Sequence, residues 1–162
     1  GSTEVSLLHD GKLVHSRSYN IGTLRMLSGK VPKAEIDAMK TELTAVSKQV
    51  PGMRIIGSGG NINKLFKLTH TKRDPKEIKV EEIKEVYGKL KTLSVEERIE
   101  QFGLKPDRAD VIIPAAEIYV AVAEALGCST LQVPNISLAD SIIDNLSKKW
   151  PFSLIAAKKK KK

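Results

Sequence analysis

The stretch MRIIGSGGNINKLF, residues 53–66, decides the fold, because it joins a short apolar strand directly to the start of a helix. The junction holds Gly57, Gly59 and Gly60 within four positions. A turn needs one glycine or two. The third glycine indicates that something approaches the backbone closely here, either a ligand or another part of the fold.

A strand, a glycine-rich turn and a helix N-terminus together form a common phosphate-binding arrangement. Backbone N–H groups point at the anion and the helix dipole favours its charge. The dipole alone contributes only ~0.3–1 kcal/mol, so we expect several donors to act together, from Gly59, Gly60 and Asn61. The alternative is a tight turn that lets strand and helix pack closely. GSGGN is neither a Walker sequence nor GxGxxG, so both interpretations stay open.

The first four residues, GSTE, come directly before a strand and offer a second set of polar groups. Gly1, Ser2 and Thr3 carry backbone and hydroxyl donors for a phosphate. Glu4 carries a carboxylate for Mg²⁺, directly or through water, since hard cations take oxygen ligands. The competing interpretation is that Gly1 and Ser2 remain from cloning and that Glu4 has no special role.

A third polar stretch, GLKPDRADVIIPAAEI at 103–118, places Arg108 and Asp110 beside an intensely apolar run. We interpret the two as a structural ion pair at the start of a helix. An acidic side chain near a helix start also interacts favourably with the dipole. A structural role is therefore favoured over a catalytic one.

The opening TEVSLLHDGKLVHSRSY reads as a β-hairpin. Asp10-Gly11 suits a two-residue hairpin loop. Pairing about that turn sets His15 opposite Ser6, which puts His9 and His15 on opposite faces of the sheet. This argues against a metal site shared by the two histidines.

Helical periodicity and capping signals follow along the rest of the chain. Ser94 and Glu97 form a capping box, and the apolar run 109–126 is expected to bend or break near Pro114. Helices are expected at 32–50, 62–69, 80–93, 94–103, 109–126 and 137–150.

Strands complete a mixed α/β pattern. Residues 18–27 are expected to form a third strand or a turn. Strands at 53–58 and 129–135 enclose the helix-rich middle, so they can pair in parallel through a right-handed crossover. This order of elements indicates one α/β lobe, with no repeat array.

Composition fits one domain or one lobe of a larger fold, with 162 residues of which 41% are apolar. No apolar run is long enough to span a membrane, and no signal peptide opens the chain. Cys128 is the single cysteine, so an intrachain disulfide is excluded. These features favour a cytoplasmic protein with no membrane partner.

The net charge of +8 lies mostly at one end, because Lys158–Lys162 carry five of the charges. We expect a body at 1–157 and a lysine tail at 158–162 that is disordered or engineered. Aromatic residues make up only 4%, which is few for stacking on nucleic-acid bases. A specific nucleic-acid partner is therefore not expected.

Taken together, these stretches resemble the exopolyphosphatase / guanosine pentaphosphate phosphatase family of the actin, Hsp70 and sugar-kinase superfamily. The resemblance covers nearly the whole chain except the tail. Five blocks occur in the family's order: GSTEVSLLHDGKL, SYNIGTLRML, IIGSGGNINKL, LSVEERIEQFGLKPDRADVIIPAAEIY and LQVPNISLADSIID.

The resemblance implies a two-lobed hydrolase with a ribonuclease-H-like fold in each lobe. Members remove the terminal phosphate from inorganic polyphosphate or guanosine pentaphosphate with Mg²⁺ and an activated water. This chain would be the second lobe. Its partners would be the substrate, the missing first lobe and, if exposed apolar surface self-associates, a second copy.

The resemblance also implies site roles. Gly1, Ser2, Thr3 and Glu4 match the end of the family's GGGSTE loop, with Glu4 in the position tied to metal and water. The segment from Gly57 to Asn61, which includes Ser58, Gly59 and Gly60, matches the second glycine loop.

Two departures limit what this chain does alone. The first lobe, with the family's general-base glutamate, is missing, and Ser141 stands where the family has glycine. General-base help is typically worth about 10²–10⁴-fold, so the fragment alone is expected to be inactive. The alternative function is a phosphate- or nucleotide-binding lobe that does not catalyse.

Overall fold

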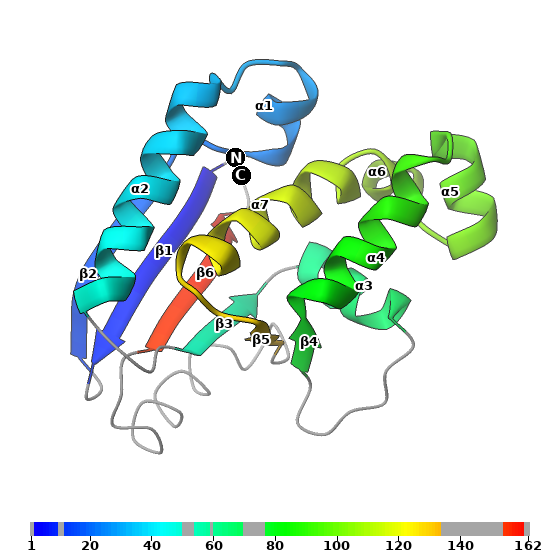
Figure 1. The fold of residues 1–162 in the computed structure, drawn as a ribbon. Helices are drawn as coiled ribbons and strands as arrows, with labels where there is room; N and C mark the ends of the chain where they lie inside the picture. Colours follow the sequence, from blue (N-terminus) through cyan, green and yellow to red (C-terminus); the bar gives the residue numbers. More distant parts are fainter. Residues whose placement is uncertain are drawn as a thin grey trace.

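The computed structural model describes residues 2–9, 12–49, 54–58, 60–69, 77–133 and 154–160 (Figure 1). These residues form a mixed sheet with helices packed on it. In chain order the elements are β1 (Ser2–His9), β2 (Lys12–Tyr19), α1 (Thr23–Leu27), α2 (Lys33–Gln49), β3 (Arg54–Ser58), α3 (Gly60–Leu68), β4 (Glu77–Lys79), α4 (Val80–Lys91), α5 (Val95–Phe102), α6 (Pro106–Ala109), α7 (Ile112–Ala125), β5 (Thr130–Gln132) and β6 (Leu154–Lys160).

The six strands lie in the order β2-β1-β6-β3-β5-β4. β1 pairs antiparallel with both β2 and β6, and β3 pairs parallel with both β6 and β5. The predicted parallel pairing of the strands around 53–58 and 129–135 is therefore confirmed. The short β4 closes one edge, antiparallel to β5.

α7 is the central helix of the core and lies across the sheet, between α2 and α4 (Figure 1). Only Glu117 and Glu124 are charged among its fourteen residues. A helix that is apolar nearly all round requires cover on most sides, and the sheet, α2, α3 and α4 supply it. None of the helices in the described part of the chain is long and apolar enough to cross a membrane.

The predicted hairpin is confirmed, but its register differs from the prediction. His15 lies opposite Leu7, and Ser6 lies opposite Ser16. The cause is a β-bulge between Leu7 and Leu8, which adds one residue to β2 and shifts the pairing beyond it. The turn residues indicate where a hairpin reverses, and they carry no signal for this bulge.

The predicted bend or break near Pro114 is confirmed as an interruption between two helices. α6 ends at Ala109 and α7 begins at Ile112, so Pro114 lies in the first turn of α7. A proline there loses no intrahelical hydrogen bond, because the first N–H groups of a helix have no acceptor. The strand or turn expected at 18–27 is instead the end of β2 followed by the one-turn helix α1.

The predicted capping box at the start of α5 is also confirmed. The Glu97 N–H donates to Ser94 Oγ at 3.2 Å, and the Ser94 N–H donates to Glu97 Oε1 at 3.1 Å. Gly103 ends the helix with a φ of 63°, in the left-handed region where glycine is favoured. The helix predicted at 137–150, including Ser141, lies outside the described residues.

The structure describes part of the lysine tail at 158–162, which the sequence predicts to be disordered or engineered, as a strand. Lys158–Lys160 form the end of β6, where all three pair with β1 and Lys158 also pairs with β3. Backbone N–H and C=O groups make such pairs whatever the side chain is, and the prediction considered only the side-chain charge. Lys161 and Lys162 lie outside the described residues.

A chain truncated after Ala157 is therefore expected to be less stable than one that keeps the strand without its charge. Truncation removes backbone pairs from the middle of the sheet, and we expect the melting temperature to fall by about 5 °C or more. The triple variant Lys158→Thr/Lys159→Thr/Lys160→Thr keeps those pairs with a strand-forming side chain. Thermal unfolding followed by circular dichroism compares the two. Equal melting of the truncated and the parent chain would show that this end of β6 contributes nothing.

Candidate functional site

The two predicted phosphate-binding segments meet at one end of the sheet. In the strand register Glu4 on β1 lies opposite Lys158 on β6, and Lys158 lies opposite Ser58 at the end of β3. Two interstrand spacings separate the Cα atoms of Glu4 and Ser58 by about 10 Å. For Glu4 and Ser58 the structure describes the backbone alone, and Gly1 and Gly59 lie outside the described residues.

The hydroxyl group of Thr3 makes a structural hydrogen bond. The Thr3 side chain is 2% exposed, and its Oγ1 donates to the Ile21 carbonyl oxygen at 2.6 Å. The bond ties the start of β1 to the segment that leads from β2 into α1. The hydroxyl proton of Thr3 is therefore already used, whereas Ser2 beside it is half-buried.

Gly57 is buried and closely packed. A Cβ atom there would lie 3.2 Å from Ile62 Cγ1, 3.5 Å from Tyr119 Cε1 and 3.6 Å from Leu131 Cδ2. Burial raises the pKa of Tyr119, so its ring packs here as a neutral group. Only the contact with Ile62 of α3 is tighter than ordinary, so close packing of β3 against α3 favours a glycine here, the alternative that the sequence left open.

The turn leads directly into α3, which begins at Gly60. Asn61 is half-buried, and its Oδ1 accepts a hydrogen bond from Arg108 Nη1 at 3.3 Å. The RAD run therefore reaches the first turn of α3 from 47 residues further along the chain. From the sequence, Arg108 is interpreted as the partner of Asp110, so its contact with Asn61 was missed. In the sequence, only the order of the family blocks hinted at this contact.

Two features at the start of α3 favour an anion. The N–H groups at the start of a helix carry a partial positive charge, and the Arg108 guanidinium lies against the same turn. The register places the backbone of Lys158–Lys160 next to residues 2–4. Within the described part of the chain, no three His, Cys, Asp or Glu residues are grouped to hold a metal ion.

Gly57→Ala separates packing from ligand binding as the reason for this glycine. We expect it to lower the free energy of unfolding by ~1–3 kcal/mol, because the added methyl group overfills a close-packed contact. Gly88 in α4 has open space around its Cα, so Gly88→Ala is the matched control and is expected to stabilise the helix by roughly 0.5–1 kcal/mol. Urea unfolding measures both. A Gly57→Ala chain with unchanged stability and lost phosphate binding would assign this glycine to the ligand instead.

Comparison with known proteins now adds to this geometry. Residues 1–149 match the model of the Ppx/GppA phosphatase family. A sequence comparison with curated proteins gave no significant match.

Solved structures with a similar fold include a Ppx/GppA protein and an exopolyphosphatase. A Ppx/GppA phosphatase of Aquifex aeolicus matches with a TM-score of 0.71 and 24% identity, over 90% of this chain and 54% of that one. An exopolyphosphatase from Cytophaga hutchinsonii matches with a TM-score of 0.65 and 15% identity, over 92% of this chain and 55% of that one.

The chain therefore spans about half the length of the solved structures that it matches. Its mixed sheet with flanking helices is the fold of these Ppx/GppA structures, the ribonuclease-H-like fold that the sequence resemblance implied. The family match covers most of the chain, from its first residue to the region before β6. The chain belongs to the Ppx/GppA phosphatase family.

Proposed function

We propose that this chain is the second lobe of a phosphohydrolase that releases the terminal phosphate from inorganic polyphosphate or guanosine pentaphosphate. The observation that carries the proposal is the strand register, which brings residues 2–4 and the turn after Gly57 to one end of the sheet. Membership of the family supports the class of reaction. The lobe supplies the surface on which the phosphate chain lies.

Binding is assigned to backbone groups and one arginine. We assign phosphate binding to the N–H groups of Gly60 and Asn61 at the start of α3, as in other helix N-terminal anion sites, and keep Gly59 as a donor predicted from the sequence. Arg108 holds the Asn61 amide by its hydrogen bond and adds a positive charge beside it. Ser2 contributes a further donor from β1, and the tied hydroxyl of Thr3 keeps that strand in place.

We propose Mg²⁺ as the metal ion of this site, as the sequence resemblance implies. Proteins commonly hold Mg²⁺ with one or two carboxylates, completed by substrate phosphates and water. Glu4 supplies one carboxylate at the end of the sheet where the substrate is placed. Bound there, Mg²⁺ would neutralise charge on the phosphate.

Turnover is assigned to the whole protein. The chain spans about half of the related structures, and the general base of the family belongs to the lobe that is absent here. Closure of two lobes also excludes water, which strengthens the electrostatic interactions within the site. The chain alone then binds the phosphate groups of the substrate without hydrolysing the substrate. We assign the protein to the cytoplasm because its sequence has one cysteine.

A non-catalytic phosphate- or nucleotide-binding lobe is the second candidate. The contacts described at this end of the sheet, namely those of Thr3, Gly57 and Arg108, are packing and positioning contacts. They are compatible with a lobe that binds and senses a phosphorylated ligand. The two candidates differ in whether Glu4 is needed for turnover.

Glu4→Gln in the full-length protein tests this difference. We expect phosphate release from polyphosphate with Mg²⁺ to fall at least 100-fold, with the affinity for substrate nearly unchanged. Glu96→Gln on the exposed surface of α5 is the control and is expected to keep full activity. The same assay with guanosine pentaphosphate identifies the preferred substrate. A full-length protein that binds either ligand and never releases phosphate would contradict the first candidate.

Arg108→Gln tests the binding assignment in the chain itself. Loss of the guanidinium removes the charge and the hydrogen bond to Asn61, so we expect the Kd for short-chain polyphosphate to rise about tenfold. Lys105→Gln removes the same charge three residues earlier, at an exposed position, and is expected to have a much smaller effect. Calorimetric titration measures both. Equal effects of the two variants would mean that only net charge matters.

A further inference from the structure

The side chain of Arg98 on α5 joins the ends of two other helices. Its Nε donates to the Leu90 carbonyl oxygen at 2.8 Å, and its Nη1 donates to the Ala109 carbonyl oxygen at 2.9 Å. Leu90 lies in the last turn of α4, and Ala109 is the last residue of α6. The last carbonyl groups of a helix have no partner within that helix. One guanidinium group therefore supplies donors to two helix ends at once, with a positive charge where the helix dipoles favour it.

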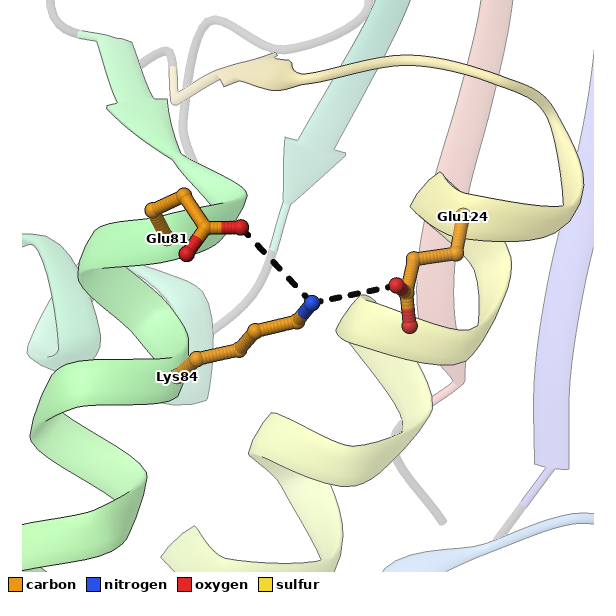
Figure 2. A network of polar contacts seen from close by, with 3 residues as sticks. All are labelled: Glu81, Lys84 and Glu124. Carbon is orange, nitrogen blue, oxygen red and sulfur yellow. Dashed lines mark hydrogen bonds and ion pairs between the residues drawn. The ribbon is translucent and has the colours of Figure 1, made fainter.

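α4 is the firmly held side of this bridge. Lys84 Nζ on α4 lies 3.1 Å from Glu124 Oε2 on α7 and 3.7 Å from Glu81 Oε1 on its own helix (Figure 2). Exposed ion pairs contribute little by themselves, so burial supplies most of the attachment. Four side chains of α4 are buried in the core: Val80, Ile83, Val86 and Leu90. The end of α4 thus gives Arg98 a fixed point of attachment.

α6 is the side of the bridge that needs support. It has only four residues, and Ala109 is its one buried residue. A helix this short is not stable in isolation, so contacts with the rest of the fold fix its position. Because Ala109 is buried, its carbonyl group needs a partner within the protein, and Arg98 supplies one. Arg108, the residue before Ala109, carries the Nη1 that donates to Asn61 Oδ1 at 3.3 Å in the first turn of α3.

We propose that Arg98 is a positioning residue for phosphate binding at the start of α3. It acts through Arg108, which it places against Asn61 by holding the end of α6. The inference rests on the proposed function, in which the first N–H groups of α3 bind phosphate. Hydrogen bonds weaken steeply when donor and acceptor move apart or out of line, so the Arg108 contact requires accurate placement of α6. Without Arg98 a ligand would have to order α6 on binding, which costs affinity.

Arg98→Lys tests this role in the chain itself. Lysine keeps the charge but replaces the planar fork with one ammonium group, which cannot reproduce both bonds. We expect the Kd for short-chain polyphosphate to rise about threefold to tenfold. Arg25→Lys at an exposed position of α1 is the matched control and is expected to leave the Kd unchanged. Calorimetric titration measures the Kd of each chain, and circular dichroism checks that each is folded.

The result separates this inference from the proposed function. A parent chain that binds no polyphosphate contradicts the proposed function and this inference with it. A parent chain that binds polyphosphate, together with an Arg98→Lys chain that binds it equally well, contradicts only the role of Arg98.

A double-mutant cycle distinguishes positioning of Arg108 from a general loss of order. Because Arg98 acts through Arg108, the double variant Arg98→Lys/Arg108→Gln is expected to bind no more weakly than Arg108→Gln alone. In the ligand-free, ¹⁵N-labelled chain, we expect Arg98→Lys to move the side-chain amide signals of Asn61 toward their positions in Arg108→Gln. Additive losses of affinity in the double variant, or Asn61 signals that do not move, overturn the proposal.

The parent chain offers a test that needs no substitution and holds even if Arg98→Lys fails to fold. Coupling between two sites is reciprocal, so bound polyphosphate is expected to stabilise the contacts of Arg98 in turn. We expect exchange of the Arg98 Nε–H with solvent to slow when polyphosphate is added to saturation. The Nε–H of the exposed Arg25 is the internal control for the effect of the anion on exchange in general. Equal changes at Arg98 and Arg25 contradict the proposal.

Discussion

The close approach of β3 to α3 at Gly57 is the contact on which the candidate site depends. With no side chain at this position, Ile62, Tyr119 and Leu131 pack against the strand from α3, α7 and β5. A larger residue would move at least one of these elements outwards. The same packing sets where β3 ends and where α3 begins, so the core determines the position of the glycine turn.

From this contact the candidate site follows in steps. α3 begins immediately after the turn, and Asn61 in its first turn is held by Arg108. β1 is held at its start by the hydrogen bond from Thr3 to Ile21. A surface for phosphate therefore needs few dedicated side chains, because backbone donors are supplied by elements that the core already positions.

Local signals allowed much of the fold to be predicted from the sequence. The antiparallel pairing of β1 with β2, the capping box of Ser94 and the interruption near Pro114 each depend on residues close together in the chain. These features were predicted and are confirmed. The parallel pairing of β3 with β5 followed from the order of strands and helices.

The features that sequence reasoning missed depend on contacts between distant residues or on the backbone alone. The bulge near Leu7 has no recognisable residue signature. The pairing of Lys158–Lys160 in β6 uses backbone groups, and the charge of a lysine run gives no indication of that pairing. The contact from Arg108 to Asn61 joins segments far apart in the chain. For Gly57, the sequence indicated a close approach, and only the structure identifies Tyr119 as one of the groups that approach it.

The central claim is that residues 2–4 and 57–61 form one phosphate-binding surface. A titration of the ¹⁵N-labelled chain with short-chain polyphosphate, followed through backbone amide chemical shifts, tests it most directly. We predict that amides of both segments shift together and saturate with one Kd. Shifts confined to the lysines of 158–162, or two segments that saturate at different ligand concentrations, would contradict it.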